Sequence, residues 1–107
     1  MYTLNTYLST LRNKVFKLLP MREAHDRGED NHLGEYLENL CSNFSGAFDC
    51  YPELAGVREI VEVYNNVVFL KNNQDIEFSK WRSFILRSTR LVQAVAVKYE
   101  GGVMYGG

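Results

Sequence analysis

Apolar residues recur every three or four positions along most of this chain, a spacing that places them on one face of an α-helix. The longest stripe spans residues 75–99, and this stretch contains neither Pro nor Gly. Its core-facing positions are Phe78, Trp81, Ile85, Ser88, Val92, Val95 and Tyr99. We therefore predict a helix of about 37 Å, capped by Asp75 and stopped by Gly101 and Gly102.

Three shorter stripes precede this one and predict helices over residues 4–19, 32–50 and 57–71. Pro20 is expected to break or kink the first helix, or to open a short extra turn over 21–28, because proline lacks an N–H and its ring crowds the preceding turn. The stretch 57–71 is also rich in β-branched residues, so a strand pair turned at Asn65 and Asn66 stays open as the alternative.

Short connections make consecutive helices antiparallel neighbours. We therefore predict an all-α antiparallel bundle of four main helices, forming a single domain over 1–100 that is followed by a loose Gly-rich tail over 101–107. Asp30 or Asn31 is the expected N-cap of the second helix. The predicted core centres on Leu11, Val15, Leu37, Leu40, Phe44, Ile60, Tyr64, Val67, Trp81, Ile85, Val92 and Val95.

The composition is that of an ordinary globular protein, with 46% hydrophobic residues, 23% charged residues and a net charge of −1. The charge is nevertheless segregated along the chain. Residues 1–20 carry three bases and no acid, residues 21–62 carry ten acids and three bases, and residues 63–107 carry six bases and three acids. The near-zero total selects neither nucleic acid nor membrane as a partner.

The cysteines and the first residues of the chain indicate a cytoplasmic protein. Cys41 falls on the apolar side of its predicted helix and Cys50 lies at the helix end, too far away to bridge. We expect both thiols to be reduced. We expect no signal peptide, because the first twenty residues are amphipathic and interrupted by charge. No apolar run approaches the length needed to span a membrane.

Two pairs of glutamates are spaced so that both carboxylates of a pair share one helix face: Glu35 with Glu38, and Glu59 with Glu62. Two such faces pointing at each other could hold Mg²⁺. The pattern resembles that of the all-α nucleotide pyrophosphohydrolases related to MazG, a Glu-x-x-Glu followed by a Glu-x-x-Asp, although Glu62 stands where that family has Asp. The resemblance implies a Mg²⁺-dependent enzyme as one alternative. The other is that these are simply two solvated acidic faces.

Two further polar groups have both a chemical and a structural interpretation. His25, Asp26, Glu29, Asp30 and His32 are metal-ligand types, but their spacing matches no standard site and favours a solvated loop. The predicted last helix carries the bases Lys80, Arg82, Arg87, Arg90 and Lys98. Such a set could bind nucleic acid, the second alternative function. Because acidic residues dilute these bases, the favoured interpretation is that they dock against the acidic middle of their own or a neighbouring chain.

Some apolar residues lie off the main stripes, at Phe16, Phe69, Leu86 and Val97. Arg90 and Gln93 lie beside Leu86 and Val97 on the helical wheel. If these residues converge, they form a patch of the apolar-plus-arginine kind found at protein interfaces. The predicted partner-binding set is therefore Leu86, Arg90, Gln93, Val97, Phe16 and Phe69. The alternative is that neighbouring elements bury them within the monomer.

The runs LLPMREAHDRGEDNHLGEYLENL, FSGAFDCYPELA and FSKWRSFILRSTR resemble small uncharacterised proteins of phages and prophages of Gram-positive bacteria. The resemblance implies a protein of the bacterial cytoplasm that binds and modulates a host or phage protein. Together with the off-stripe residues, it predicts a non-enzymatic interaction protein, with no cofactor, that binds a protein partner and self-associates as a homo-oligomer.

Overall fold

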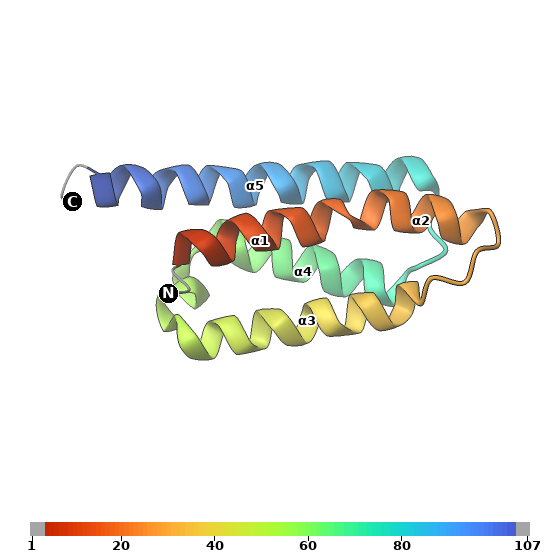
Figure 1. The fold of residues 1–107 in the computed structure, drawn as a ribbon, viewed down its shortest axis with the longest axis horizontal. Helices are drawn as coiled ribbons and strands as arrows, with labels where there is room; N and C mark the ends of the chain where they lie inside the picture. Colours follow the sequence, from red (N-terminus) through yellow and green to blue (C-terminus); the bar gives the residue numbers. More distant parts are fainter. Residues whose placement is uncertain (1–3, 105–107) are drawn as a thin grey trace.

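The computed structural model describes residues 4–104, with side chains for residues 4–98. Throughout residues 4–104 the regular structure is helical and no strand occurs. The elements are α1 (Leu4–Phe16), α2 (Leu18–Asp26), α3 (Leu33–Cys50), the 3-10 helix η1 (Pro52–Gly56), α4 (Arg58–Asn72) and α5 (Phe78–Met104). Because α1 and α2 form one bent helix, the chain is an antiparallel bundle of four main helices, as predicted (Figure 1).

The bend between α1 and α2 follows from Pro20. A proline removes one backbone donor and its ring clashes with the carbonyl four residues earlier, here that of Phe16. The helix is interrupted directly after Phe16, at Lys17, and resumes at Leu18. Pro20 then occupies the first turn of α2, where a missing N–H leaves no helical bond unmade. The predicted extra turn over 21–28 is thus part of a nine-residue helix that already contains Pro20.

Aromatic side chains from both neighbouring helices hold this bend. The Tyr36 hydroxyl on α3 donates to the Lys14 carbonyl at 2.7 Å. The Trp81 indole N–H on α5 donates to the Leu18 carbonyl at 3.0 Å. These carbonyls lie on either side of Lys17, so the bent helix is fixed to α3 and α5 at its weakest point.

The connection from α2 to α3 contains two residues with left-handed backbone conformation. One follows the end of α2 and the other caps the start of α3. Gly28, at φ 86°, follows the C-cap Arg27. The Gly28 and Glu29 amides donate to the carbonyls of His25 and Ala24, which is the Schellman pattern. His32, at φ 55°, is the N-cap of α3. The expectation that Asp30 or Asn31 caps this helix is therefore wrong.

The helix predicted over residues 57–71 forms as α4, one residue later at each end, and the alternative of a strand pair is wrong. Val57, in extended conformation, precedes α4, which runs without interruption through Asn65 and Asn66 to Asn72. Its buried residues are Ile60, Val63, Val67 and Leu70, which keep the helical spacing. Packing of this stripe outweighs the weak β preference of its valines.

The last helix differs from its prediction at both ends. It begins at Phe78 rather than at Asp75, which lies in the turn between α4 and α5. It also continues through Gly101 and Gly102 to Met104, so the two glycines do not stop it. The predicted loose tail over 101–107 is therefore wrong for residues 101–104, and residues 105–107 lie outside the described part of the chain.

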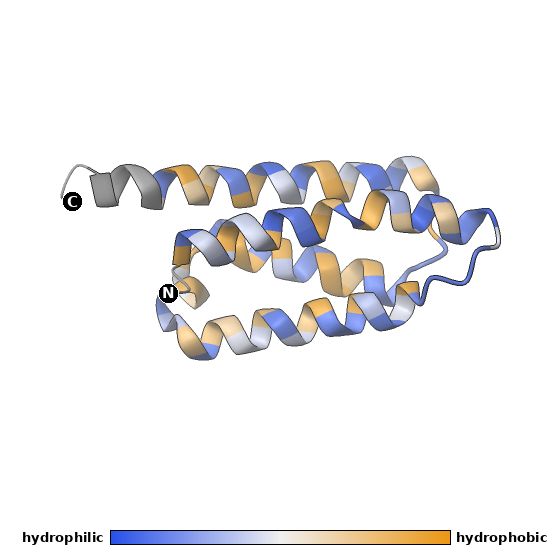
Figure 2. Cartoon of the chain, viewed as in Figure 1, coloured by the Kyte–Doolittle hydropathy of each residue, from blue (hydrophilic) through white to orange (hydrophobic). Residues whose placement is uncertain are grey.

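The core lies along the bundle axis, where the apolar stripes of all the helices meet (Figure 2). Every predicted core residue is buried except Tyr64, which is half-buried. The Tyr64 ring packs against Phe44 and Phe48, with centroid distances of 5.4 and 5.8 Å. None of the helices in the described part of the chain is long and apolar enough to cross a membrane.

Candidate interaction surfaces

Five of the six predicted partner-binding residues lie along the outer side of the contact between α1 and α5. Arg12 donates a hydrogen bond from its guanidinium to the Gln93 side-chain oxygen, which fixes how the two helices are aligned. The helices are antiparallel (Figure 1). The turn of α1 that follows Arg12 therefore lies beside the turns of α5 that precede Gln93. We name this the α1–α5 surface, and its residues are Phe16, Leu86, Arg90, Gln93 and Val97.

The α1–α5 surface is partly apolar and partly basic. Phe16 and Val97 are 51% and 55% exposed. Leu86 is half-buried and packs against the core. Arg90 is exposed and forms no hydrogen bond or ion pair within residues 4–98. Two exposed apolar side chains beside a free guanidinium match the composition of protein interfaces, which are enriched in aromatic residues and arginine.

Phe69 does not belong to this surface. Its ring lies on α4 and packs against Phe84 of α5, with 4.9 Å between the centroids. Phe84 and Gln93 are nine residues apart, which corresponds to about half a turn around the helix. Phe69, although 41% exposed, therefore lies on the opposite flank of α5.

The four glutamates of the acidic pairs do not converge. Glu35 and Glu38 are in the first turns of α3, and Glu59 and Glu62 are in the first turns of α4. Because α3 and α4 are antiparallel and joined by η1, the two pairs lie at opposite ends of the bundle (Figure 1). The facing arrangement that a shared Mg²⁺ ion needs is absent from this part of the structure.

The polar segment between α2 and α3 is occupied by local ion pairs. Asp26 binds the Arg22 Nε at 2.9 Å, and Glu29 binds Arg27 at the same distance. The exposed His32 ring lies 3.8 to 3.9 Å from Glu35 and Asp30. Among the described residues, no three His, Cys, Asp or Glu side chains are grouped so that they could hold a metal ion.

The basic residues of α5 are mixed with acids. Arg87 forms an ion pair with Glu62, which lowers the pKa of that carboxyl chiefly through the hydrogen bond. Arg87 and Lys98 line a shallow groove together with Glu59 and Glu62. This face therefore carries both signs of charge, and one base of α5 docks against the acidic middle of its own chain. The mixture does not favour a nucleic-acid phosphate backbone as the ligand.

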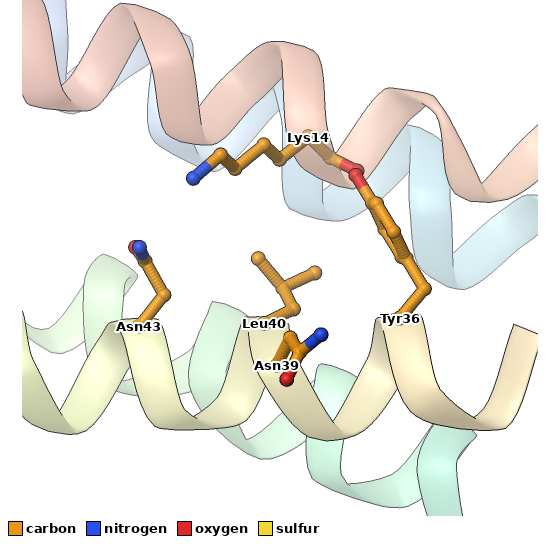
Figure 3. A pocket seen from close by; sticks show the side chains of 5 residues that line it. All are labelled: Lys14, Tyr36, Asn39, Leu40 and Asn43. Carbon is orange, nitrogen blue, oxygen red and sulfur yellow. The ribbon is translucent and has the colours of Figure 1, made fainter.

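A groove between α1 and α3 was not expected from the sequence. One part, of about 250 Å³, is lined by Lys14, Tyr36, Asn39, Leu40 and Asn43 (Figure 3). The adjoining part, of about 390 Å³, is lined by Tyr7, Asn43, Gly46, Ala47, Cys50 and Tyr51. Asn43 lines both parts, so they are neighbours along α3, and we name them together the α1–α3 groove. Burial at its edge raises the pKa of Tyr36.

The buried Arg22 was also not anticipated, because it lies in a polar run without periodicity. Its guanidinium is 5.1 Å from the Trp81 ring centroid, and its Nη2 donates to the Ile76 carbonyl at 2.6 Å. Only 6% of the residue is exposed. Arg22 therefore joins α2 to the turn before α5 and has a structural role.

The two cysteines are free in the structure. Cys41 is half-buried, and this burial raises its pKa, an effect that Lys71 opposes and Glu38 reinforces. Cys50 is exposed at the end of α3.

Comparison with protein-family models, with curated proteins and with solved structures finds no match to this chain. The class of protein is therefore defined by the fold alone: a small all-α bundle with one bent helix.

Proposed function

We propose that this chain is a non-enzymatic interaction protein that binds a protein partner through the α1–α5 surface. The observation that supports the proposal is the exposure of Phe16 and Val97 on that surface, beside Arg90, which has no ion pair among the described side chains. Apolar side chains that stay exposed in a small protein gain stability by being covered, and an arginine beside them can bind a carboxylate of the partner. The same surface would serve self-association.

The resemblance of the sequence to small phage and prophage proteins supports a host or phage protein as the partner, in the bacterial cytoplasm. Such a protein would modulate its partner by occupying a surface rather than by a reaction. The resemblance to MazG-like pyrophosphohydrolases gains no support from the placement of Glu35, Glu38, Glu59 and Glu62 at two separate ends.

The test replaces the two exposed apolar residues by charge. In the double variant Phe16→Glu with Val97→Glu, the fold should persist because both side chains are more than half exposed. Leu86 is left unchanged because it packs against the core. Phe69→Glu, on the opposite flank of α5, is the matched control.

Two measurements on these variants decide the proposal. Light scattering after size-exclusion chromatography should show a wild-type and control oligomer that the double variant loses. Affinity capture from bacterial lysate should recover one protein with wild type and with Phe69→Glu, but not with the double variant. A monomer that captures nothing, or a partner retained by the double variant, would contradict the proposal.

A further inference from the structure

The α1–α3 groove is long and has helical walls. It extends along α3 from Tyr36 to Cys50, a distance of about 21 Å at 1.5 Å per residue. This is about four helical turns. The backbone donors and acceptors of α1 and α3 are used within the helices, so an extended peptide would find no free edge with which to pair. A helix is the element that fits such a groove.

The groove has a one-sided charge. Lys14 extends from α1 across the space above Leu40, toward Asn43 (Figure 3). Its ammonium has no ion pair within the described residues, and no Asp or Glu lines either part of the groove. Lys17, at the bend, lies with its ammonium 5.7 Å above the Tyr36 ring, at the same end. A ligand in the groove is therefore expected to carry an acidic group that pairs with Lys14.

A polar atom that lines the groove also lacks a hydrogen-bond donor among the described residues. Within the described residues, the side-chain oxygen of Asn43 is buried and accepts no hydrogen bond. A buried acceptor without a donor is destabilising, and rotation of the half-buried Asn43 amide toward the groove would let a donor from a bound segment satisfy it. A ligand that binds here should therefore supply a hydrogen-bond donor for Asn43 and a carboxylate for Lys14, close to each other.

Gly46 adds a third observation. It lies inside α3, where glycine is less favourable than alanine. A Cβ built at this position would meet nothing within 4 Å. Nothing within the chain therefore requires a glycine here, whereas a second helix lying in the groove could approach the α3 backbone closely at this point.

We propose that the α1–α3 groove binds an amphipathic helix of a partner protein, whose docking face carries an aspartate or glutamate for Lys14. A donor side chain of the same helix reaches the oxygen of Asn43, and small or apolar residues lie over Gly46 and Ala47. This site is separate from the α1–α5 surface and does not depend on the function proposed for it.

The experiment selects binding sequences without assuming one. A displayed library of helix-forming peptides of about 20 residues, long enough to fill the groove, is panned against the full-length protein. Enriched peptides should carry Asp or Glu on their apolar face. Their dissociation constants are then measured against four proteins: wild type, Lys14→Glu, Gly46→Gln and Ser45→Gln.

The four proteins separate the groove from the rest of α3. Gly46→Gln adds a side chain to the groove at a position where a Cβ meets nothing within 4 Å. Ser45→Gln is the matched control, because Ser45 is exposed and points away from the groove residues on the helical wheel of α3. Lys14→Glu and Gly46→Gln should each weaken binding by about tenfold to a hundredfold, as expected when a desolvated charge pair or a close contact is lost. Ser45→Gln should bind like wild type.

Three outcomes would overturn the proposal. They are an unenriched library, enriched peptides without an acidic residue, and binding that Lys14→Glu and Gly46→Gln leave unchanged. Circular dichroism of each variant confirms that it is folded. The double variant Phe16→Glu with Val97→Glu should bind the selected peptides as wild type does, which keeps this test independent of the α1–α5 surface.

Discussion

Helix α1 has neighbours on both flanks, α5 on one side and α3 on the other, and the two contacts are built differently. Toward α5, α1 makes its most extensive helix contact among the described residues, and Arg12 bonds to Gln93 at the outer edge. The apolar side chains Leu8, Leu11 and Val15 of α1 are fully buried in the core. Long apolar side chains interdigitate and exclude water. This flank is therefore closed along the length of α1.

Toward α3, the facing residues are shorter and more polar. They include Asn39, Asn43 and Gly46, and the hydroxyl of Tyr36 supplies the hydrogen bond that links α3 to α1. It is α2, beyond the bend, that makes the packing contact with α3. The size of the side chains at facing positions thus decides which seam of the bundle closes and which stays open as a groove.

Truncation of Trp81 tests the closed side and should have the largest effect. The side chain is fully buried, and its N–H holds the Leu18 carbonyl at the bend. Trp81→Ala should lower the free energy of unfolding by about 3–5 kcal/mol, measured by urea denaturation followed by circular dichroism. Trp81→Phe, which keeps a ring but loses the N–H, should lose less. Wild-type stability in Trp81→Ala would contradict the described core.

Removal of the Tyr36 hydroxyl tests the open side, where a smaller effect is expected. Tyr36→Phe deletes the hydrogen bond to the Lys14 carbonyl and should lower the free energy of unfolding by about 0.5–1.5 kcal/mol. The same denaturation experiment measures it. A loss as large as that of Trp81→Ala would show that the two flanks of α1 are equally coupled, and the contrast between them would fail.

The closed side could be predicted from the sequence because it depends on periodicity. Leu11, Val15, Trp81 and Val92 belong to stripes that any helical arrangement must bury, and all four are buried. The helix in residues 57–71 follows from the same argument. Pro20 likewise predicted the interruption of the first helix.

The open side could not be predicted, because besides the size of its side chains it depends on the angle between two helices that are not consecutive in the chain. The bend at Lys17 sets the direction of α1, and no local pattern reports its size. The sequence did contain one indication of the groove. Asn39, Asn43 and Gly46 are uncharged and follow one another at helical spacing outside the apolar stripe of residues 32–50. The start of α5 was missed for a similar reason: Ile76 packs against the core and its carbonyl binds Arg22, which holds the preceding turn out of the helix.

A substitution at Gly46 tests the open side with a change that should make the protein more stable. Gly46→Ala adds a methyl group that meets nothing within 4 Å and should raise the free energy of unfolding by about 0.5–1 kcal/mol. Gly28→Ala is the control, since its φ of 86° strains any other residue and should make that variant less stable than wild type. If Gly46→Ala is destabilising in thermal denaturation, the α1–α3 groove is filled in solution.

The smallest effect is expected at the Glu62–Arg87 pair, which links α4 to α5 on the far side of the bundle from the α1–α3 groove. The hydrogen bond from Arg87 lowers the pKa of Glu62 below its ordinary value of 4.5. A carboxyl with a lowered folded-state pKa stabilises the fold above its unfolded pKa, and this contribution disappears as the pH falls through the folded pKa. Wild type should therefore lose slightly more stability below pH 4.5 than Glu62→Gln, which has no charge to lose.

Glu53→Gln, which changes an exposed carboxyl with no ion pair among the described residues, should follow wild type. Because the pair is exposed, 1 M salt should remove the difference. If wild type and Glu62→Gln still differ in their loss of stability in 1 M salt, the contact between α4 and α5 is held by its charges and not by the buried residues beneath them.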